Sequence, residues 1–194
     1  MREISPAYNL TADEFLRVSP REVVRVVEKI RQEKEQGGRS LPSDSLIDKS
    51  NFLNQDVREF LVNEVAMLVD ENLTGRSDMC SQFAMLLSLA LNYLGVHSRP
   101  VAGVCIFFKE GKEIYRWDHA WVRVDNEVID GNLDILYENP LVPNEISVKP
   151  YWGSISNIPS DRRLRETNGV SLPEDDDVSN VWWPDLKDRL AHLI

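Results

Sequence analysis

The chain has 194 residues, of which 42% are hydrophobic and 28% are charged, and its net charge at pH 7 is −10. This composition is ordinary for a globular protein, so we expect a single domain over 1–194 with one sizeable core. The acidic balance argues against nucleic acid as a partner, because phosphate binding needs Lys and Arg gathered on one surface. The longest apolar stretch, 83–91, is too short to cross a bilayer, and no membrane partner is expected.

The cysteine count and the first residues indicate a compartment. The N-terminal residues lack the apolar segment of a secretory signal, and two cysteines do not make a disulfide framework. We therefore expect a cytoplasmic protein, with export by a route without cleavage left open. Three histidines and two cysteines without a short-spaced pair form no zinc motif, so no metal and no cofactor are expected. The sequence carries no signal for an oligomeric state.

The N-terminal region, 1–73, is predicted to be helical. Two capping boxes mark helix starts, because a capping side chain and an acid three residues later can both bond to free backbone N–H groups. These pairs are Thr11 with Glu14 and Ser19 with Glu22. A polar loop over 39–50 follows, and the spacing of apolar residues over 55–70 predicts a further helix with one buried face.

The stretch 77–96, SDMCSQFAMLLSLALNYLGV, places a cysteine at the front of an almost wholly apolar run. Ser77 is a good N-cap, so Cys80 is expected in the first turn of a buried helix that Gly95 ends in the left-handed conformation. Backbone N–H groups and the helix dipole favour the thiolate there, which is the reactive form of cysteine. A lone cysteine is more often a buried structural residue, so position alone assigns no role.

From Arg99 the pattern changes to short segments rich in β-branched and aromatic residues, separated by turns. The segments are 99–108, 113–117 and 119–124. They predict an antiparallel meander. Helices first and strands second indicate an α+β fold with the helices packed on an antiparallel sheet.

The last part of the chain, 134–194, is predicted to be an irregular extension, because prolines are frequent beyond Asn139. A short closing helix is expected over 185–193. The oppositely charged runs 161–165 and 173–177 are interpreted as solvated surface.

The stretch 117–132, WDHAWVRVDNEVIDGN, is interpreted as a hairpin whose two turn residues are 125–126. The side chains expected on one face are then His119, Trp121, Asp130 and Asn132. The diagonal between His119 and Asp130 is about 7–8 Å at Cβ, which lets the carboxylate meet the imidazole. A register one residue different would put Asp130 on the other face. Asp118 is expected to point away from the side of His119 and is a poor partner for it.

Together these segments resemble the transglutaminase-like superfamily over 74–133. The similar motifs are a cysteine opening an apolar helix that ends in LGV, then RPVAGV, HAWVRV and VIDGN. The resemblance implies a papain-like α+β fold with a Cys, His and Asp triad in that chain order. Carried onto this sequence, Cys80 is the nucleophile, His119 the base and Asp130 the orienting acid. RSDM before the cysteine, where relatives often have Gly or Trp, and DGN, where many have DPT, affect the substrate class and leave the triad intact.

The chemistry of these residue types agrees with that implication. His119 would take the proton of Cys80, and the thiolate would attack an amide or ester carbonyl to give a thioacyl enzyme. Water as acceptor gives hydrolysis or deamidation, and an amine gives transamidation. We therefore expect a cysteine peptidase, deamidase or transamidase with a peptide or protein substrate. The Cys80 N–H needs a second oxyanion donor, and the candidate oxyanion and substrate residues are Asn51, Gln55, Trp117, Trp121 and Asn132.

Two other interpretations stay open. A non-catalytic module with the same fold would use the same cleft to hold a peptide or a partner protein. Acyl transfer from a thioester, as in arylamine acetyltransferases, uses the same order of Cys, His and Asp, although nothing marks a coenzyme A site. The residues assigned to packing or capping rather than chemistry are His97, Cys105, Trp182 and Trp183.

Overall fold

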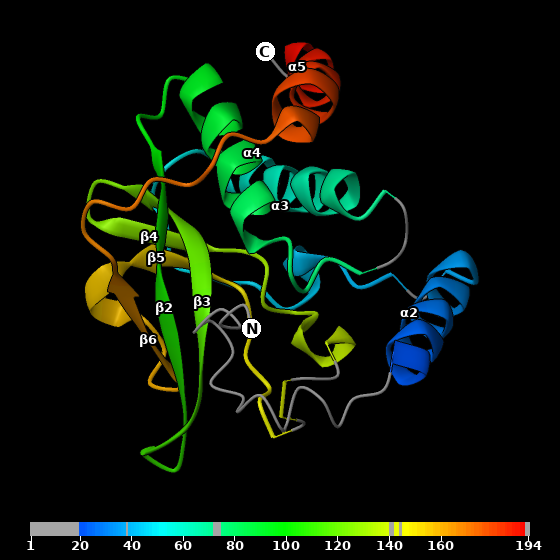
Figure 1. The fold of residues 1–194 in the computed structure, drawn as a ribbon. Helices are drawn as coiled ribbons and strands as arrows, with labels where there is room; N and C mark the ends of the chain where they lie inside the picture. Colours follow the sequence, from blue (N-terminus) through cyan, green and yellow to red (C-terminus); the bar gives the residue numbers. More distant parts are fainter. Residues whose placement is uncertain (1–19, 38, 72–74, 140–141, 144, 193–194) are drawn as a thin grey trace.

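The computed structural model describes residues 20–37, 39–71, 75–139, 142–143 and 145–192, and the helix expected at Thr11 lies outside them. The described residues form an α+β fold, in which helices pack beside a six-stranded mixed sheet (Figure 1). The α-helices are α2 (Pro20–Glu35), α3 (Gln55–Val69), α4 (Cys80–Tyr93) and α5 (Trp183–Ala191), with a π-helix, η4 (Val178–Trp182), before α5. Short 3₁₀ helices are η1 (Pro42–Asp44), η2 (Leu136–Glu138) and η3 (Ile155–Asn157).

The sheet has the strand order β1-β5-β4-β3-β2-β6. Its strands are β1 (Ile47–Asp48), β2 (Arg99–Lys109), β3 (Lys112–Val124), β4 (Glu127–Asp130), β5 (Tyr151–Ser154) and β6 (Arg162–Glu166). All neighbours are antiparallel except β1 and β5, which run parallel. The expectation of a fully antiparallel sheet is therefore corrected at the β1 edge. The expected loop over 39–50 contains strand β1, whose Ile47 N–H donates to the Pro150 carbonyl at 2.9 Å.

The two central helices follow their sequence signals. The Asn54 side chain caps α3 by accepting from the Val57 N–H at 2.8 Å. After α4, Gly95 takes φ +79° and the Val96 N–H donates to the Leu91 carbonyl at 2.9 Å, as in a Schellman motif.

The predicted start of α4 is corrected by the structure. Met79 is the N-cap and Cys80 is the first helical residue, whereas the sequence placed the cap at Ser77. The reason is a turn before the helix, in which the Met79 N–H donates to the Arg76 carbonyl at 3.0 Å. Cys80 thus stands at the very tip of the helix.

The predicted strand segments 113–117 and 119–124 are one continuous strand, β3, which pairs along its length with β2. A tight turn with Glu110 at φ +52° and Gly111 at φ +75° joins these two strands. The predicted turn over 125–126 is confirmed, because Val124 pairs with Glu127. This register decides which side chains of β3 and β4 share a face.

The main core lies between the helices and one face of the sheet. In Figure 1, α4 and α3 lie beside the strands, and α5 lies next to α4. The core residues from β3 and β4 are Ala120, Val122, Val124 and Ile129, packed with the apolar side chains of α3, α4 and α5. Trp182 is buried in this core, as expected. In the described part of the chain, no helix has the length and apolar character needed to span a membrane.

The segment 134–194, expected to be an irregular extension, contributes two strands to the sheet, β5 and β6, which lie on opposite sides of the β4-β3-β2 strands. Strand β5 pairs with β4, and β6 pairs with β2, so two strands of this segment belong to the same sheet as the preceding strands. Pro150 stands just before β5, where a proline removes no ladder hydrogen bond, and Pro159 precedes β6. These two prolines therefore precede strands, although the frequent prolines of this segment predict irregular structure.

Candidate active site

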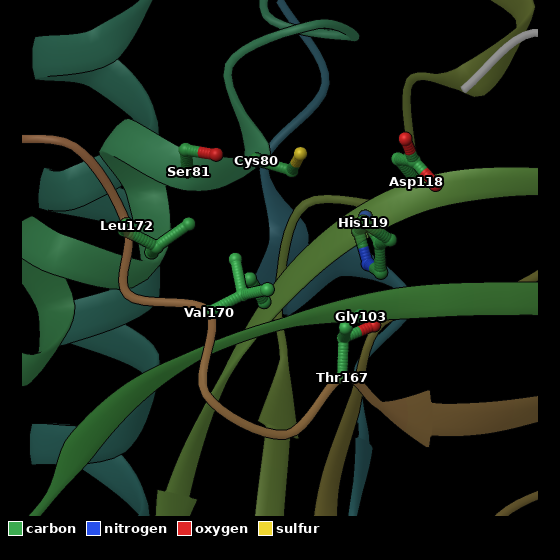
Figure 2. A pocket seen from close by; sticks show the side chains of 9 residues that line it. Cys80, Ser81, Gly103, Asp118, His119, Thr167, Val170 and Leu172 are labelled. Atoms are coloured by element: carbon green, nitrogen blue, oxygen red, sulfur yellow. The ribbon is translucent and has the colours of Figure 1, made fainter. Parts of the chain in front are cut away.

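Three side chains from separate elements meet where α4 approaches the sheet. Cys80 is the first residue of α4, His119 lies within β3, and Asp130 is the last residue of β4. In Figure 2 the Cys80 sulfur points towards β3, the strand that carries His119. All three residues are buried, with exposed fractions of 7%, 6% and 1%. As the hairpin register predicted, the side chains of His119 and Asp130 lie close enough to form a hydrogen bond.

His119 is held on one side by Asp130 and on the other by Cys80. Its Nε2 lies 2.7 Å from Asp130 Oδ1, and the Cys80 side chain lies near enough to the ring to raise its pKa. Because Asp130 takes Nε2, Nδ1 is the ring nitrogen left for the sulfur. Burial alone would lower the pKa of His119, but the charge and hydrogen bond of Asp130 and the contact with Cys80 raise it from 6.5 to about 10. The imidazole is therefore protonated at neutral pH.

Arg162 of β6 is a fourth charged residue in this cluster. Its Nη1 lies 3.5 Å from Asp130 Oδ2, so each carboxylate oxygen of Asp130 faces a different cation. The guanidinium also donates to the Lys149 carbonyl at 2.6 Å and to Asp161 at 2.9 Å. The Arg162 side chain is fully buried, which corrects its interpretation as solvated surface. The buried guanidinium is thus compensated by two carboxylates, Asp130 and Asp161, as a buried charge requires.

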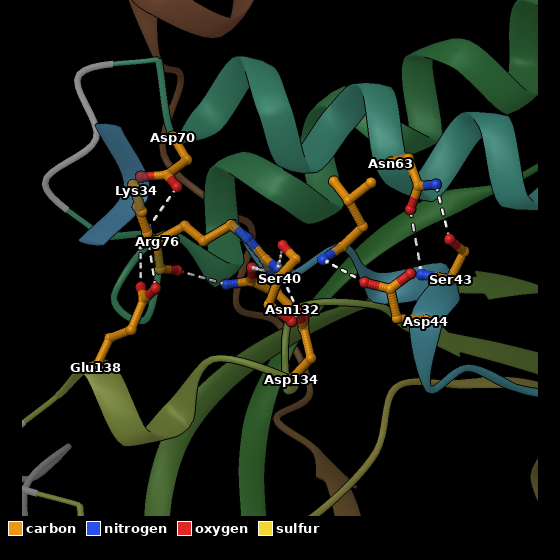
Figure 3. A network of polar contacts seen from close by, with 11 residues as sticks. Lys34, Ser40, Ser43, Asp44, Asn63, Asp70, Arg76, Asn132, Asp134 and Glu138 are labelled. Carbon is orange, nitrogen blue, oxygen red and sulfur yellow. Dashed lines mark hydrogen bonds and ion pairs between the residues drawn. The ribbon is translucent and has the colours of Figure 1, made fainter. Parts of the chain in front are cut away.

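A buried polar network fixes the turn that leads into Cys80 (Figure 3). Arg76 is 1% exposed, and its Nη1 donates to Asn132 Oδ1 at 2.7 Å. The Asn132 Nδ2 donates back to the Arg76 carbonyl at 2.7 Å. The other end of the guanidinium pairs with Asp134. Residues just before Cys80 are thereby joined to residues just after Asp130.

A second part of this network joins the same turn to α2. The Lys34 ammonium lies 2.6 Å from Asp70 Oδ2 and 2.8 Å from Glu138 Oε1. Glu138 Oε2 accepts from the Arg76 N–H at 3.2 Å, and Asp70 Oδ1 accepts from the Gly75 N–H at 3.1 Å. The turn that carries Cys80 is therefore held through its backbone as well as through the Arg76 side chain.

A cleft of about 300 Å³ opens at Cys80 and His119. Its lining residues are Cys80, Ser81, Ala102, Gly103, Asp118, His119, Thr167, Val170 and Leu172. A Cβ added to Gly103 would lie 2.1 Å from the Arg165 carbonyl oxygen and 2.5 Å from the Trp121 ring, so only glycine fits this wall. Cys80 is thus reached from solvent through a groove bounded by the sheet and the segment after β6.

The candidate oxyanion and substrate residues fall outside this lining. Asn51 is exposed, and Gln55 donates to Glu59 at 2.7 Å on the outer surface of α3. Trp117 packs in a separate buried cluster around Cys105. These three residues are therefore not brought to the sulfur.

The other two candidates lie close to the triad without lining the cleft. Trp121 is buried beside His119, with ring centroids 6.1 Å apart, and fixes one side of the imidazole. Asn132 belongs to the Arg76 network. Both act on the site through a neighbour, because each one contacts a side chain or backbone group that leads to the triad.

The other cysteine and the other histidines lie outside the lining of the cleft at Cys80. Cys105 is fully buried, and burial together with the charge of Asp130 raises the pKa of its thiol. His97 and His192 are exposed. Among the described residues, no group of three or more His, Cys, Asp and Glu side chains could hold a metal ion.

Sequence reasoning missed Arg162 and Arg76. In the run DRRLR, Arg162 and Leu164 alternate with Arg163 and Arg165, which is the period of a strand with one buried face. That alternation was the available signal for an inward-facing arginine. No comparable pattern surrounds Arg76, whose burial follows from contacts with residues 56 and 58 positions later.

Comparison with known proteins identifies no relative for this chain. The sequence matches no family model and no curated protein, and the fold matches no solved structure. The function is therefore inferred from the site alone.

Proposed function

We propose that this chain is a cysteine-dependent enzyme that acts on an amide carbonyl through a thioacyl intermediate, with a papain-like, transglutaminase-like arrangement of its triad. The observation that carries the proposal is that Cys80 and His119 line the same open cleft, with His119 bound from behind by Asp130 and its pKa influenced by Cys80. A structural cysteine in a core has no need of an oriented imidazole beside its sulfur.

The raised pKa of His119 refines the first step of the mechanism. Asp130 raises the pKa of His119, so the imidazole can hold the proton that Cys80 gives up, and the attacking group is a thiolate beside an imidazolium. The thiolate attacks the amide carbonyl and forms a tetrahedral intermediate. The His119 imidazolium then gives its proton to the leaving amine as the C–N bond breaks, which leaves a thioester on Cys80.

Deacylation uses the same residues in reverse order. The neutral imidazole accepts a proton from water or an amine as that nucleophile attacks the thioester, and the Cys80 thiolate leaves. Asp130 keeps the ring orientation through both half-reactions by its contact with Nε2. The backbone N–H of Cys80 is a candidate oxyanion donor, because the first N–H groups of an α-helix have no partner within the helix.

Alkylation of the native protein tests the nucleophile without knowledge of the substrate. With iodoacetamide at pH 7, intact-mass analysis and peptide mapping should show one fast modification at Cys80, at least about tenfold faster than at the fully buried Cys105. His119→Gln should slow the reaction at Cys80 and leave that at Cys105 unchanged. Equal, slow labelling of both cysteines would contradict the proposal.

Turnover separates an enzyme from a binding module. A library of peptides that contain glutamine and internal amide bonds, incubated with and without a primary amine, distinguishes hydrolysis, deamidation and transamidation by the product mass. Cys80→Ser should abolish every product. A native protein with a fast-reacting Cys80 that binds peptides and forms no product would favour the non-catalytic module.

A further inference from the structure

The cleft contains one exposed carboxylate. Asp118 immediately precedes His119 in β3, and its side chain is exposed while that of His119 is buried. Asp130 orients His119, so Asp118 is not needed for that role. Among the described residues, none forms an ion pair with Asp118. With respect to the part of the chain that the structure describes, this carboxylate at the mouth of the cleft can therefore pair with a ligand.

The opposite wall of the cleft is apolar. It is formed by Val170, which is 53% exposed, and by Leu172. Figure 2 shows these two side chains on one side of the Cys80 sulfur and Asp118 on the other.

The segment that carries this apolar wall is anchored at both ends. The Thr167 N–H donates to the Ala102 carbonyl at 3.0 Å. Further along, Asp175 accepts from the Gln82 side chain of α4 at 3.0 Å. The apolar wall and Asp118 are therefore held on opposite sides of the cleft in a fixed arrangement.

We propose that the cleft selects substrates with a cationic alkyl side chain, of the lysine or arginine type, beside the amide that Cys80 attacks. The inference rests on the proposed function and adds the substrate class. The aliphatic stem of such a side chain would pack against Val170 and Leu172, while its charged end would reach Asp118. An acidic substrate would face the carboxylate of Asp118 and the thiolate of Cys80. The net charge of −10 also favours the association of a cationic substrate over that of an acidic one.

Charged thiol reagents measure this selectivity without an identified substrate. Three methanethiosulfonates that carry a trimethylammonium, a sulfonate or only a methyl group react with a thiolate in the same way. The sulfur of Cys80 forms a mixed disulfide and methanesulfinate leaves, so the rates differ through the charge of the transferred group. The rates are measured at Cys80 by intact-mass analysis in a Cys105→Ala background.

We expect the cationic reagent to react faster than the anionic one, and Asp118→Asn to lower their rate ratio about five- to tenfold. Division by the rate of the neutral reagent removes any change in the reactivity of the thiolate itself. Asp188→Asn is the matched control, because Asp188 is an exposed carboxylate on α5 and changes the net charge equally. This control should leave the ratio within about twofold. Because Asp118 is exposed, its replacement should change the stability little.

A second measurement uses reversible ligands. Butylammonium should protect Cys80 from iodoacetamide with saturation, butyrate should not, and Asp118→Asn should remove the protection. If Cys80 reacts fast but the charge ratio is the same in Asp118→Asn and in the parent, the inferred substrate class is wrong. If Cys80 reacts no faster than Cys105 with the neutral reagent in the unmodified chain, the proposed function itself is wrong.

Discussion

Replacement of Arg162 by methionine removes one of the two cations that face the Asp130 carboxylate. Methionine keeps much of the length and the apolar stem of arginine while it deletes the guanidinium. The change leaves Asp130 buried with His119 as its partner, and it leaves the Lys149 carbonyl without the donor that lies 2.6 Å away. We therefore expect Arg162→Met to destabilise the fold strongly.

The magnitude follows from the distances. Two unit charges 3.5 Å apart, the separation of Arg162 Nη1 and Asp130 Oδ2, attract by about 5 kcal/mol at an effective dielectric constant of about 20. The guanidinium loses hydration when it is buried, and removal of one member of a buried ion pair costs about 3–5 kcal/mol. Since a folded domain is stable by roughly 5–15 kcal/mol, this loss is a large part of the total.

Urea unfolding followed by tryptophan fluorescence measures the effect, since the chain has 5 tryptophans. Arg162→Lys keeps the charge but loses the forked geometry of the guanidinium. Its free energy of unfolding should therefore lie between those of the parent and Arg162→Met, and it should give a folded sample. Arg163→Met is the matched control. Arg163 is exposed and lies 5.2 Å from the Phe108 ring, so its loss should cost about 1 kcal/mol or less.

The reasoning is refuted if Arg162→Met unfolds with the same free energy as Arg163→Met. That result would mean that the Asp130 carboxylate does not depend on a second cation.

The pKa of His119 provides a separate test of the same reasoning. Without the guanidinium beside Asp130, the pKa of His119 should rise further, because the carboxylate then interacts with the imidazolium alone. An NMR titration of Arg162→Lys and the parent should show closely similar His119 values.

Three further predictions concern the surroundings of the triad. Gly131→Ala should slow Cys80 alkylation, measured by mass spectrometry, because the added Cβ would lie 2.7 Å from the Phe83 ring and push α4 from β4. Arg76→Met should lower the free energy of unfolding in urea by about 3–5 kcal/mol, because it leaves Asp134 buried without its cation. The raised pKa of His119 adds stability that is complete below pH 6.5 and is lost as the pH rises towards 10. The unfolding free energy of the parent should therefore fall more than that of His119→Gln between pH 7 and 10.

Each of these predictions has an opposing outcome. An unchanged alkylation rate in Gly131→Ala would mean that Phe83 moves aside without shifting the helix. A loss below about 1 kcal/mol in Arg76→Met would mean that water replaces the guanidinium. A parent whose stability rises between pH 7 and 10 relative to His119→Gln would contradict the assigned charge state of the imidazole.

The parts of the site that depend on local signals could be predicted from the sequence. The turn over 125–126 sets the pairing of β3 with β4, and the alternation of side chains along a strand then puts His119 and Asp130 on one face. Gly95 ends α4 by a conformation that glycine adopts easily. In both cases a few adjacent residues decide the geometry.

The parts that depend on distant segments could not be predicted in this way. Arg162 reaches Asp130 from a strand that pairs with β2, and no property of either residue reveals that pairing. Asn51 and Gln55 were proposed as oxyanion residues from their type, but their distance from the sulfur depends on how α3 packs against α4. The start of α4 was misplaced because the turn at Arg76 is fixed by residues after β4.

The position of Arg162 in the chain has a consequence for synthesis. A growing polypeptide contains Cys80, His119 and Asp130 before β6 has been made, so the three residues exist for a time without the guanidinium that balances them. A nascent chain that ends before residue 162 therefore has an Asp130 carboxylate that lacks the second cation facing it in the complete fold. We therefore expect the charge cluster around Asp130 to be complete only after β6 has joined the edge of the sheet.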